Sequence, residues 1–149
     1  MENNEGQKSA GEDVSDGVDR DWLLQHLVTF ANHDKDFSQP ITLWVGGGVI
    51  SGLMVSGERF FDAYTDEFVQ RFTPEAAEVT RATLRRIGSR YYEKDEVPNG
   101  NNTIYIHLLD AKFWSPSGCI PSGNGQGVTW RGRISQVVGY SLGQLKQAD

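Results

Sequence analysis

The chain has 149 residues, of which 38% are hydrophobic and 23% are charged, proportions that suit one soluble domain. Its apolar runs fall short of the ~20 residues that a membrane-spanning helix needs, which argues against an integral membrane protein. A single cysteine, Cys119, excludes an internal disulfide and a thiolate metal site. Residues 1–20 are acidic and lack an apolar core, so we expect no signal peptide there and a cytoplasmic location.

The formal net charge of −6 is concentrated in the first twenty residues. Residues 1–20 hold six acidic and two basic side chains, so they carry −4 and leave −2 for the rest. They contain no Leu, Ile or aromatic residue and bury too little apolar surface to offset the entropy of ordering. We therefore predict a disordered acidic tail over 1–20 and one globular domain over 21–149. This charge balance is unlike the basic surface of a general nucleic-acid binder.

The first predicted element is a helix over residues 19–34. Asp19 or Asp21 can cap it, because a carboxylate accepts hydrogen bonds from the first free backbone N–H groups. Apolar residues at helical spacing define the face that should pack on the rest of the domain. They are Trp22, Leu23, Leu27, Val28 and Ala31.

A β-hairpin is predicted after this helix. Residues 41–45 alternate in polarity, which places Trp44 on the face opposite to its apolar neighbours. Three consecutive glycines favour a tight turn into a returning strand over residues 49–55. Gly52 lies inside that strand, where a glycine often marks a β-bulge or a sharp bend.

Two helices are predicted between the hairpin and the later strands. Ser56 can cap the first, whose aromatic residues recur about every four positions and should bury against the sheet. This stripe consists of Phe60, Phe61, Tyr64, Phe68 and Phe72. Thr73 and Pro74 start the second helix. Its later turns are basic, which suits a solvated face, an acidic protein partner (the acidic tail included) or, less well, nucleic acid. The basic residues are Arg81, Arg85, Arg86 and Arg90.

Three further strands are predicted over residues 103–113, 128–134 and 137–145. The intervening residues 115–127 are rich in glycine, with two prolines, and predict a mobile loop. The order of helix, hairpin, two helices and three strands predicts an α+β fold. Its sheet is either an open barrel of the Sm-like or SH3-like kind, or a five-stranded, mainly antiparallel sheet covered by helices on one face. This fold-level analogy says little about function.

Motifs for catalysis or cofactor binding are not found in the sequence. It lacks the nucleophile elbow, the zinc-protease helix motif and the phosphate loop. His26 and His33 lie two helical turns apart, about 10 Å, which is too far for one metal ion. His107 and Cys119 make a poor nucleophile pair, since Cys119 has no basic neighbour in sequence. We therefore expect no enzyme activity, no cofactor and no metal.

Two blocks of the sequence carry a more specific pattern. The first is residues 41–68, which include the motifs V-I-S-G and M-V-S. The second combines I-H-L within residues 104–114 and W-R-G-R-I within residues 128–145. In order and approximate spacing these blocks resemble the U-type (GvpU-like) family of gas vesicle accessory proteins. The resemblance covers somewhat more than a third of the chain.

The resemblance implies a non-enzymatic accessory protein, cytoplasmic and associated with gas vesicles, that acts in vesicle assembly, organisation or clustering. It implies contacts with the vesicle shell or with other accessory proteins, and self-association is compatible with it. The mean hydropathy of −0.48 is unlike that of the very apolar main shell protein. The alternative is an Sm-like RNA-binding or ring-forming module, which the acidic net charge disfavours.

Exposed aromatic and arginine side chains are the candidates for partner contact, because Trp, Tyr and Arg are enriched at binding hot spots. We expect outward-facing residues of the strands and the basic helix to take this role. The candidates are Trp44, Tyr105, His107, Arg131, Arg133, Arg81, Arg85, Arg86 and Arg90. For Trp44, packing beneath a helix is the other open interpretation.

Overall fold

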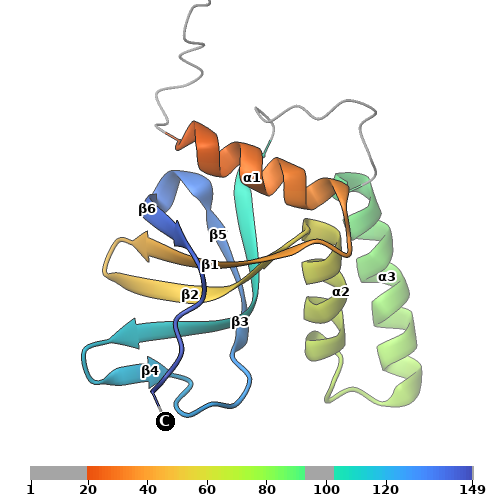
Figure 1. Ribbon diagram of the computed structural model, residues 1–149. Coiled ribbons are helices and arrows are strands. Elements are labelled where there is room, and N and C mark those ends of the chain that lie inside the picture. The colour runs from red at the N-terminus through yellow and green to blue at the C-terminus, as the bar shows by residue number, and fades with distance from the viewer. Residues whose placement is uncertain (1–19, 93–102, 149) are drawn as a thin grey trace, which may run out of the picture.

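The computed structural model describes residues 20–92 and 103–148, which form three α-helices and a six-stranded sheet (Figure 1). The helices are α1 (Trp22–His33), α2 (Gly57–Phe68) and α3 (Pro74–Tyr92). The strands are β1 (Ser38–Val45), β2 (Gly48–Val55), β3 (Tyr105–Ser115), β4 (Gly118–Ile120), β5 (Val128–Arg133) and β6 (Val137–Leu142). In this part of the chain, no helix is both long and apolar enough to cross a membrane. The predicted disordered tail lies, except for Arg20, outside the described residues.

All strand pairs are antiparallel, in the order β4-β3-β2-β1-β6, and β5 also pairs with β3. β3 has eleven residues, so its first part can pair with β5 while its last three residues pair with β4. This arrangement confirms the predicted α+β fold with an open antiparallel sheet. β4 departs from the prediction, since it lies within residues 115–127, which the composition assigns to a mobile loop.

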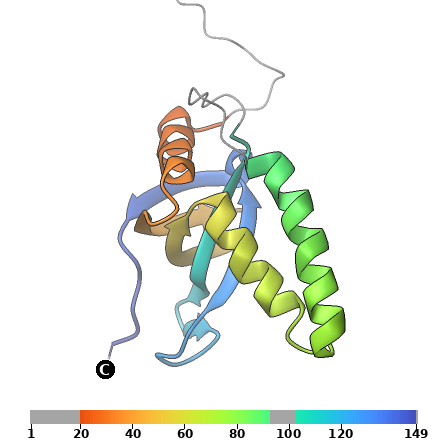
Figure 2. The ribbon, with the colours of Figure 1, turned by 90° about the vertical axis from the view of Figure 1, so that its right-hand side faces the viewer.

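The sheet is strongly curled. β5 and β6 are four strand steps apart along the sheet, and in a flat sheet that would separate them by about 19 Å. Only the three residues of a 3₁₀ turn, Ile134–Gln136, connect these strands, and such a turn spans about 6 Å. The two ends of the sheet must therefore approach each other, which gives it the form of an open barrel (Figure 2).

Helix α1 packs on the curled sheet and contributes one side of the core (Figure 1). Its cap is Asp21, whose carboxylate accepts from the backbone N–H groups of the first turn at 2.9 and 3.0 Å. The predicted packing face is right for Val28 and Ala31 but wrong for Trp22, which is 70% exposed while Leu24 is buried. The core consists of Leu24, Val28, Ala31, Ile41, Leu43, Ile50, Met54, Ile106, Leu108, Ala111, Ile134 and Val137.

The β1–β2 hairpin has the predicted register and turn, with Gly47 at a φ of +90°. Trp44 is 42% exposed, because its neighbours Ile41 and Leu43 take the core face. Gly52 lies where the β2–β3 register shifts, as expected of a bulge. A Cβ at Gly52 would lie only 2.9 Å from the carbonyl oxygen of Leu109, so only glycine fits without movement of the backbone.

The C-terminal residues 143–148 run back across the outer face of the sheet (Figure 1). Thr42 and Ser51 are buried polar residues on β1 and β2, and their hydroxyls lie 3.0 Å apart. Thr42 Oγ1 donates to the carbonyl of Gly143 at 2.8 Å, and Ser51 Oγ accepts from the N–H of Leu145 at 2.8 Å. These hydroxyls are buried because they bind the backbone of this C-terminal segment.

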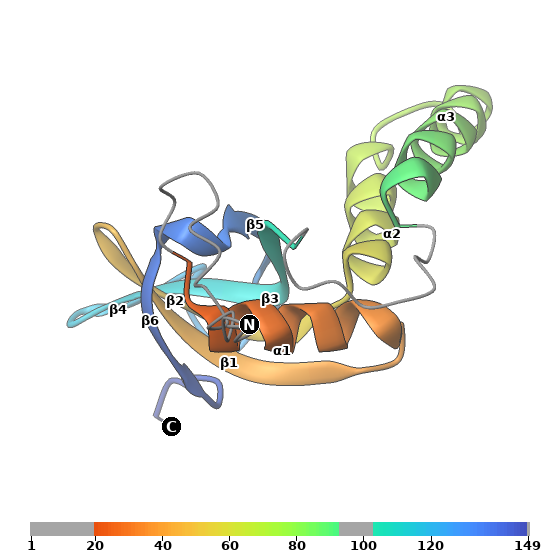
Figure 3. The same cartoon turned by 90° about the horizontal axis from the view of Figure 1, so that it is seen from above.

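Helices α2 and α3 form a hairpin that projects from the side of the sheet (Figure 3). As predicted, Ser56 caps α2, with its Oγ accepting from the N–H of Arg59 at 3.0 Å, and Thr73 caps α3. The two helices approach closely where Gly88 of α3 faces the ring of Phe61, since a Cβ at Gly88 would lie 2.7 Å from that ring.

The predicted burial of the aromatic stripe against the sheet is wrong for most of its length. Phe60 is 4% exposed, but Tyr64, Phe68 and Phe72 are 42%, 51% and 42% exposed. The reason is that α2 buries another side: Thr65 and Val69 are each 2% exposed, and Glu67 in the last turn bonds Thr129 of β5 at 2.8 Å, which leaves the later rings of the stripe on the exposed side of the projecting hairpin (Figure 3). The periodicity identifies the stripe correctly but does not say what lies beside it.

Candidate interaction surface

Three of the predicted contact residues meet on the β3–β5 pair. In the antiparallel register His107 is opposite Arg131, and Tyr105 is opposite Arg133. The guanidinium carbon of Arg131 lies 3.5 Å from the centroid of the Tyr105 ring, a cation–π contact. Nε of Arg131 donates to Nε2 of His107 at 3.2 Å. We refer to Tyr105, His107 and Arg131 as the arginine cluster.

His107 lies on the outer face of the sheet, as its strand position predicts, but it is only 2% exposed. The ring of Phe60 covers it at a centroid distance of 4.7 Å. Burial, and then the positive charge of Arg131, lower the pKa of His107 from 6.5 to about 3. His107 is therefore a neutral acceptor that holds Arg131 in place, and it cannot itself reach a partner.

The exposed rings of α2 continue directly from this cluster. Phe60, Tyr64, Phe68 and Phe72 form a continuous row, which we call the aromatic ladder; its last member lies in the turn that follows the helix. Successive ring centroids are 5.9, 6.2 and 5.6 Å apart. Because Phe60 touches both His107 and Tyr64, the arginine cluster and the ladder make one surface across strands and helix.

The acidic residues beside the ladder already have partners. Asp62 binds Lys35 at 2.7 Å, Asp66 binds Arg81 at 3.1 Å, and Glu67 accepts from a threonine hydroxyl of β5 at 2.8 Å. Arg131 has no such acid: within the described residues it makes no ion pair. Its positive charge is therefore available to a partner.

The other predicted contact residues lie apart from this surface. Trp44 is aligned across β2 with Trp114, whereas His107 lies seven residues before Trp114 on β3 and is aligned with Val55. That separation amounts to about 23 Å of strand. The basic helix forms a third location, where Arg81 pairs with Asp66 and the remaining arginines are exposed. These are Arg85, Arg86 and Arg90.

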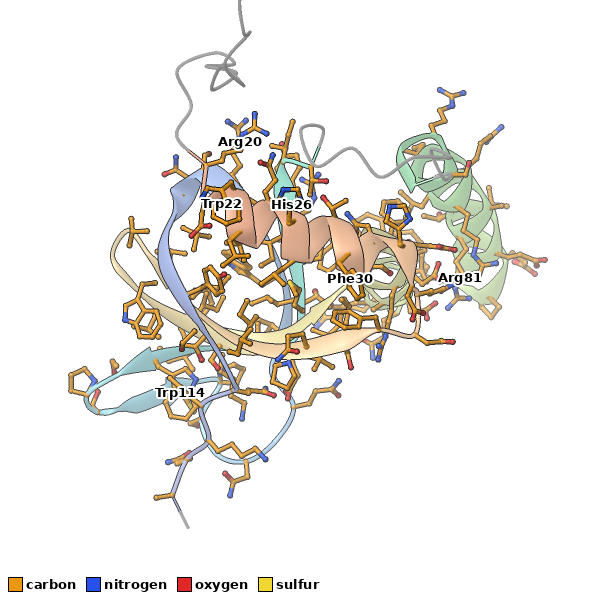
Figure 4. The ribbon with its side chains drawn as sticks, turned by 45° about the horizontal axis from the view of Figure 1, so that its top comes forward. Arg20, Trp22, His26, Phe30, Arg81 and Trp114 are labelled. Atoms are coloured by element: carbon orange, nitrogen blue, oxygen red, sulfur yellow. The ribbon has the colours of Figure 1, made fainter. Side chains whose placement is uncertain are left out.

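A second exposed aromatic row lies on α1, and of its members only Trp22 belongs to the face that is predicted to pack on the domain. Trp22, His26 and Phe30 follow one another at four-residue steps along the solvent side of the helix (Figure 4). The sequence could have indicated this row, because an aromatic at every fourth position is as compatible with an outer face as with an inner one.

Metal-binding groups do not assemble in the described residues: no three His, Cys, Asp or Glu side chains come together there. Cys119 is buried, and its Sγ lies 3.3 Å from the carbonyl oxygen of Pro121. Cys119 and His107, which the sequence makes a poor nucleophile pair, lie at different positions along β3. His107 bonds Arg131 in the first part of β3, and Cys119 pairs with Trp114 near the end of that strand.

The fold defines a small α+β protein, an open antiparallel sheet with a projecting helical hairpin and exposed aromatic rows. The family model for the gas vesicle protein GvpU-like family matches residues 21–145, and the chain belongs to this family. Membership makes it a gas vesicle-associated protein and confirms the resemblance seen in the sequence blocks. No curated protein and no solved structure matches the chain significantly.

Proposed function

We propose that this chain is a non-enzymatic accessory protein that acts in gas vesicle assembly, organisation or clustering through protein–protein contacts in the cytoplasm. The observation that carries the proposal is the continuous surface formed by the aromatic ladder and the arginine cluster. Three of the four ladder rings are more than two-fifths exposed, and exposed apolar rows of this kind mark interaction sites.

The composition of this surface supports protein contact in particular. Aromatic side chains have few rotatable bonds, and tyrosine, tryptophan and arginine are enriched among the residues that dominate the energetics of protein interfaces. Arg131 is already fixed by a ring and a hydrogen bond, so little of its side-chain freedom remains to be lost. The vesicle shell and other gas vesicle proteins are the proposed partners, and self-association is a further proposal.

Flotation of gas vesicles tests the proposal. Vesicle-bearing cells that lack the natural gene are complemented with the wild type, with Phe68→Ser/Phe72→Ser, or with Val138→Ser. Val138 is the matched control, since it is an 80% exposed apolar residue on β6, away from the ladder. We expect the wild type and the control to float with the vesicles, and the double variant to remain in the soluble fraction while keeping its circular dichroism spectrum.

Two results would overturn the proposal. If the wild type stays in the soluble fraction and its deletion changes neither vesicle number nor vesicle distribution in the cell, the protein has no accessory role. If the double variant floats and complements as well as the wild type does, the contacts do not use the ladder.

A further inference from the structure

We infer that the aromatic ladder and Arg131 together form a docking site for an acidic amphipathic helix of a partner protein. The inference rests on the proposed function, and it adds the chemistry of the segment that the partner presents.

The geometry of the ladder favours a helix as its occupant. The first two centroid spacings, 5.9 and 6.2 Å, follow the four-residue step of α2, about 6 Å along the axis, and Phe72 in the following turn extends the row by 5.6 Å. A second helix packed nearly parallel or antiparallel to α2 repeats its side chains at the same step. Apolar side chains spaced three and four residues apart can therefore lie between successive rings.

Backbone hydrogen bonding disfavours an extended segment on the ladder. The backbone of α2 bonds to itself, and of the four ladder side chains only Tyr64 offers a conventional hydrogen-bonding group, its hydroxyl. An extended segment lying on the ladder would leave its own N–H and C=O groups without partners wherever the rings exclude water. A helix brings those groups already paired, so it buries apolar area on the rings without this cost.

Arg131 specifies the acidic character of the partner. Its Nε is occupied by His107 and one face of its guanidinium lies on Tyr105, so its terminal nitrogens remain for a carboxylate. Arg133, opposite Tyr105 on the same face of β5, likewise makes no ion pair with a described residue. The acids along α2 are held by other groups, so the charge at this end of the ladder is positive.

The chain's own acidic segment is a poorer occupant than a partner helix. Residues 1–19 include six acidic side chains, which suits Arg131. They contain no Leu, Ile or aromatic residue, however, and so offer almost nothing to the three exposed rings of the ladder. The site needs charge and apolar side chains in one segment, which points to a separate protein.

Synthetic helical peptides provide the probe. The first is a fluorescein-labelled peptide, stapled into a helix, with leucines spaced three and four residues apart and glutamates at one end. The second replaces each glutamate by lysine and keeps everything else. Fluorescence anisotropy with the full-length protein at low salt measures both affinities. We expect the glutamate peptide to bind at least about tenfold more tightly, which corresponds to about 1.4 kcal/mol.

Exchanging the charge on the protein tests the role of Arg131 directly. Arg131→Glu should lose affinity for the glutamate peptide and gain affinity for the lysine peptide. Lys146→Glu makes the same charge change at an exposed position of the C-terminal segment, which bonds β1 and β2 rather than the ladder, and it should leave the preference unchanged. Phe68→Ser changes an exposed side chain outside the core and should weaken the binding of both peptides.

The outcomes separate this inference from the proposed function. No binding of either peptide, equal binding of both, or a preference that Arg131→Glu does not reverse would overturn the helix-docking site. If the protein floats with vesicles but gives one of these results, the proposed function stands and the helix-docking site is wrong. If the protein binds the glutamate peptide selectively but neither floats with vesicles nor affects them, the docking site stands and the proposed gas vesicle role is wrong.

Discussion

The guanidinium of Arg131 donates a hydrogen bond across the β3–β5 pair to Nε2 of His107, at 3.2 Å. An acceptor at Nε2 requires the neutral imidazole, because a protonated Nε2 has no lone pair to offer. The bond therefore ties the position of an exposed cation to the protonation state of a buried histidine. Phe60 of α2 packs on the ring of His107, so this contact connects the sheet with the α2–α3 hairpin.

We predict that this histidine makes the protein less stable in mild acid. His107 titrates near 6.5 in the unfolded chain and near 3 in the folded one, so the unfolded state binds the additional proton in between. Its contribution to stability is complete above about pH 6.5 and is lost as the pH falls toward 3, at up to about 1.4 kcal/mol per pH unit.

Urea unfolding between about pH 7 and pH 4 measures this slope. His107→Gln is the comparison, since glutamine can accept from Arg131 but does not titrate. We expect the free energy of unfolding to fall more steeply for the wild type than for the variant. Equal slopes in the two proteins would show that His107 is not buried as a neutral residue.

Trp44→Ala should weaken attachment to partners while leaving the fold almost intact. Trp44 is 42% exposed, so we expect its removal to cost about 1 kcal/mol, whereas Leu43→Ala beside it removes a fully buried side chain and should cost about 2–5 kcal/mol. Thermal unfolding compares the two variants, and flotation reports attachment. A loss of stability for Trp44→Ala as large as that for Leu43→Ala would make it a core residue.

Gly52→Ala should destabilise the sheet by about 1–3 kcal/mol. Its Cβ would meet the carbonyl oxygen of Leu109 at 2.9 Å and the Cα of Ala111 at 3.0 Å, and both are backbone atoms that cannot rotate away. Gly46→Ala is the control, because nothing lies within 4 Å of a Cβ there and its φ is not in the left-handed region. Equal melting temperatures for the two variants would contradict the close approach of β2 and β3.

Ser51→Ala should release the C-terminal segment, residues 143–148. The substitution leaves the N–H of Leu145 without its acceptor and removes a buried partner of Thr42, with an expected cost of about 1–3 kcal/mol. Hydrogen exchange checks this locally: the amide of Leu145 should lose protection while amides in the β1–β2 hairpin keep theirs. Unchanged protection at Leu145 would mean that other contacts hold the segment.

The RNA-binding alternative makes a simple spectroscopic prediction. A gas vesicle accessory protein with a net charge of −6 should purify at moderate salt free of nucleic acid, with the 260/280 nm absorbance ratio of pure protein. A raised ratio that falls after ribonuclease treatment would instead favour the Sm-like RNA-binding module.

Local signals in the sequence predicted most of the elements. Asp21, Ser56 and Thr73 cap the helices as their positions suggest, since a cap depends only on the backbone of the following turn. The hairpin and the bulge at Gly52 follow from alternation and from glycine, which are local as well. The curled, antiparallel sheet was one of the two alternatives predicted from the order of the elements and from the tendency of sheets to close their edges.

The candidate site was predicted only in part, because its main features depend on distant parts of the chain. The pairing of His107 with Arg131 follows from strand register, yet the burial of His107 requires Phe60, 47 positions earlier in the sequence. The exposure of Phe68 depends on which side of α2 the rest of the fold covers, and periodicity carries no information about that side. The buried hydroxyl of Ser51 is explained only by the returning C-terminal segment.

The position of the α2–α3 hairpin couples ligand binding on the ladder to the stability of the hairpin itself. α3 packs chiefly on α2, and the contacts of α2 with the strands include Phe60 on His107 of β3 and the bond between Glu67 and Thr129 of β5. The hairpin can therefore open on its own, at a free energy set by its small interface rather than by the core. A ligand that binds the ladder and Arg131 of β5 together requires the closed arrangement, so its binding free energy adds to that smaller quantity, and the occupancy of the surface and the population of the closed hairpin rise and fall together.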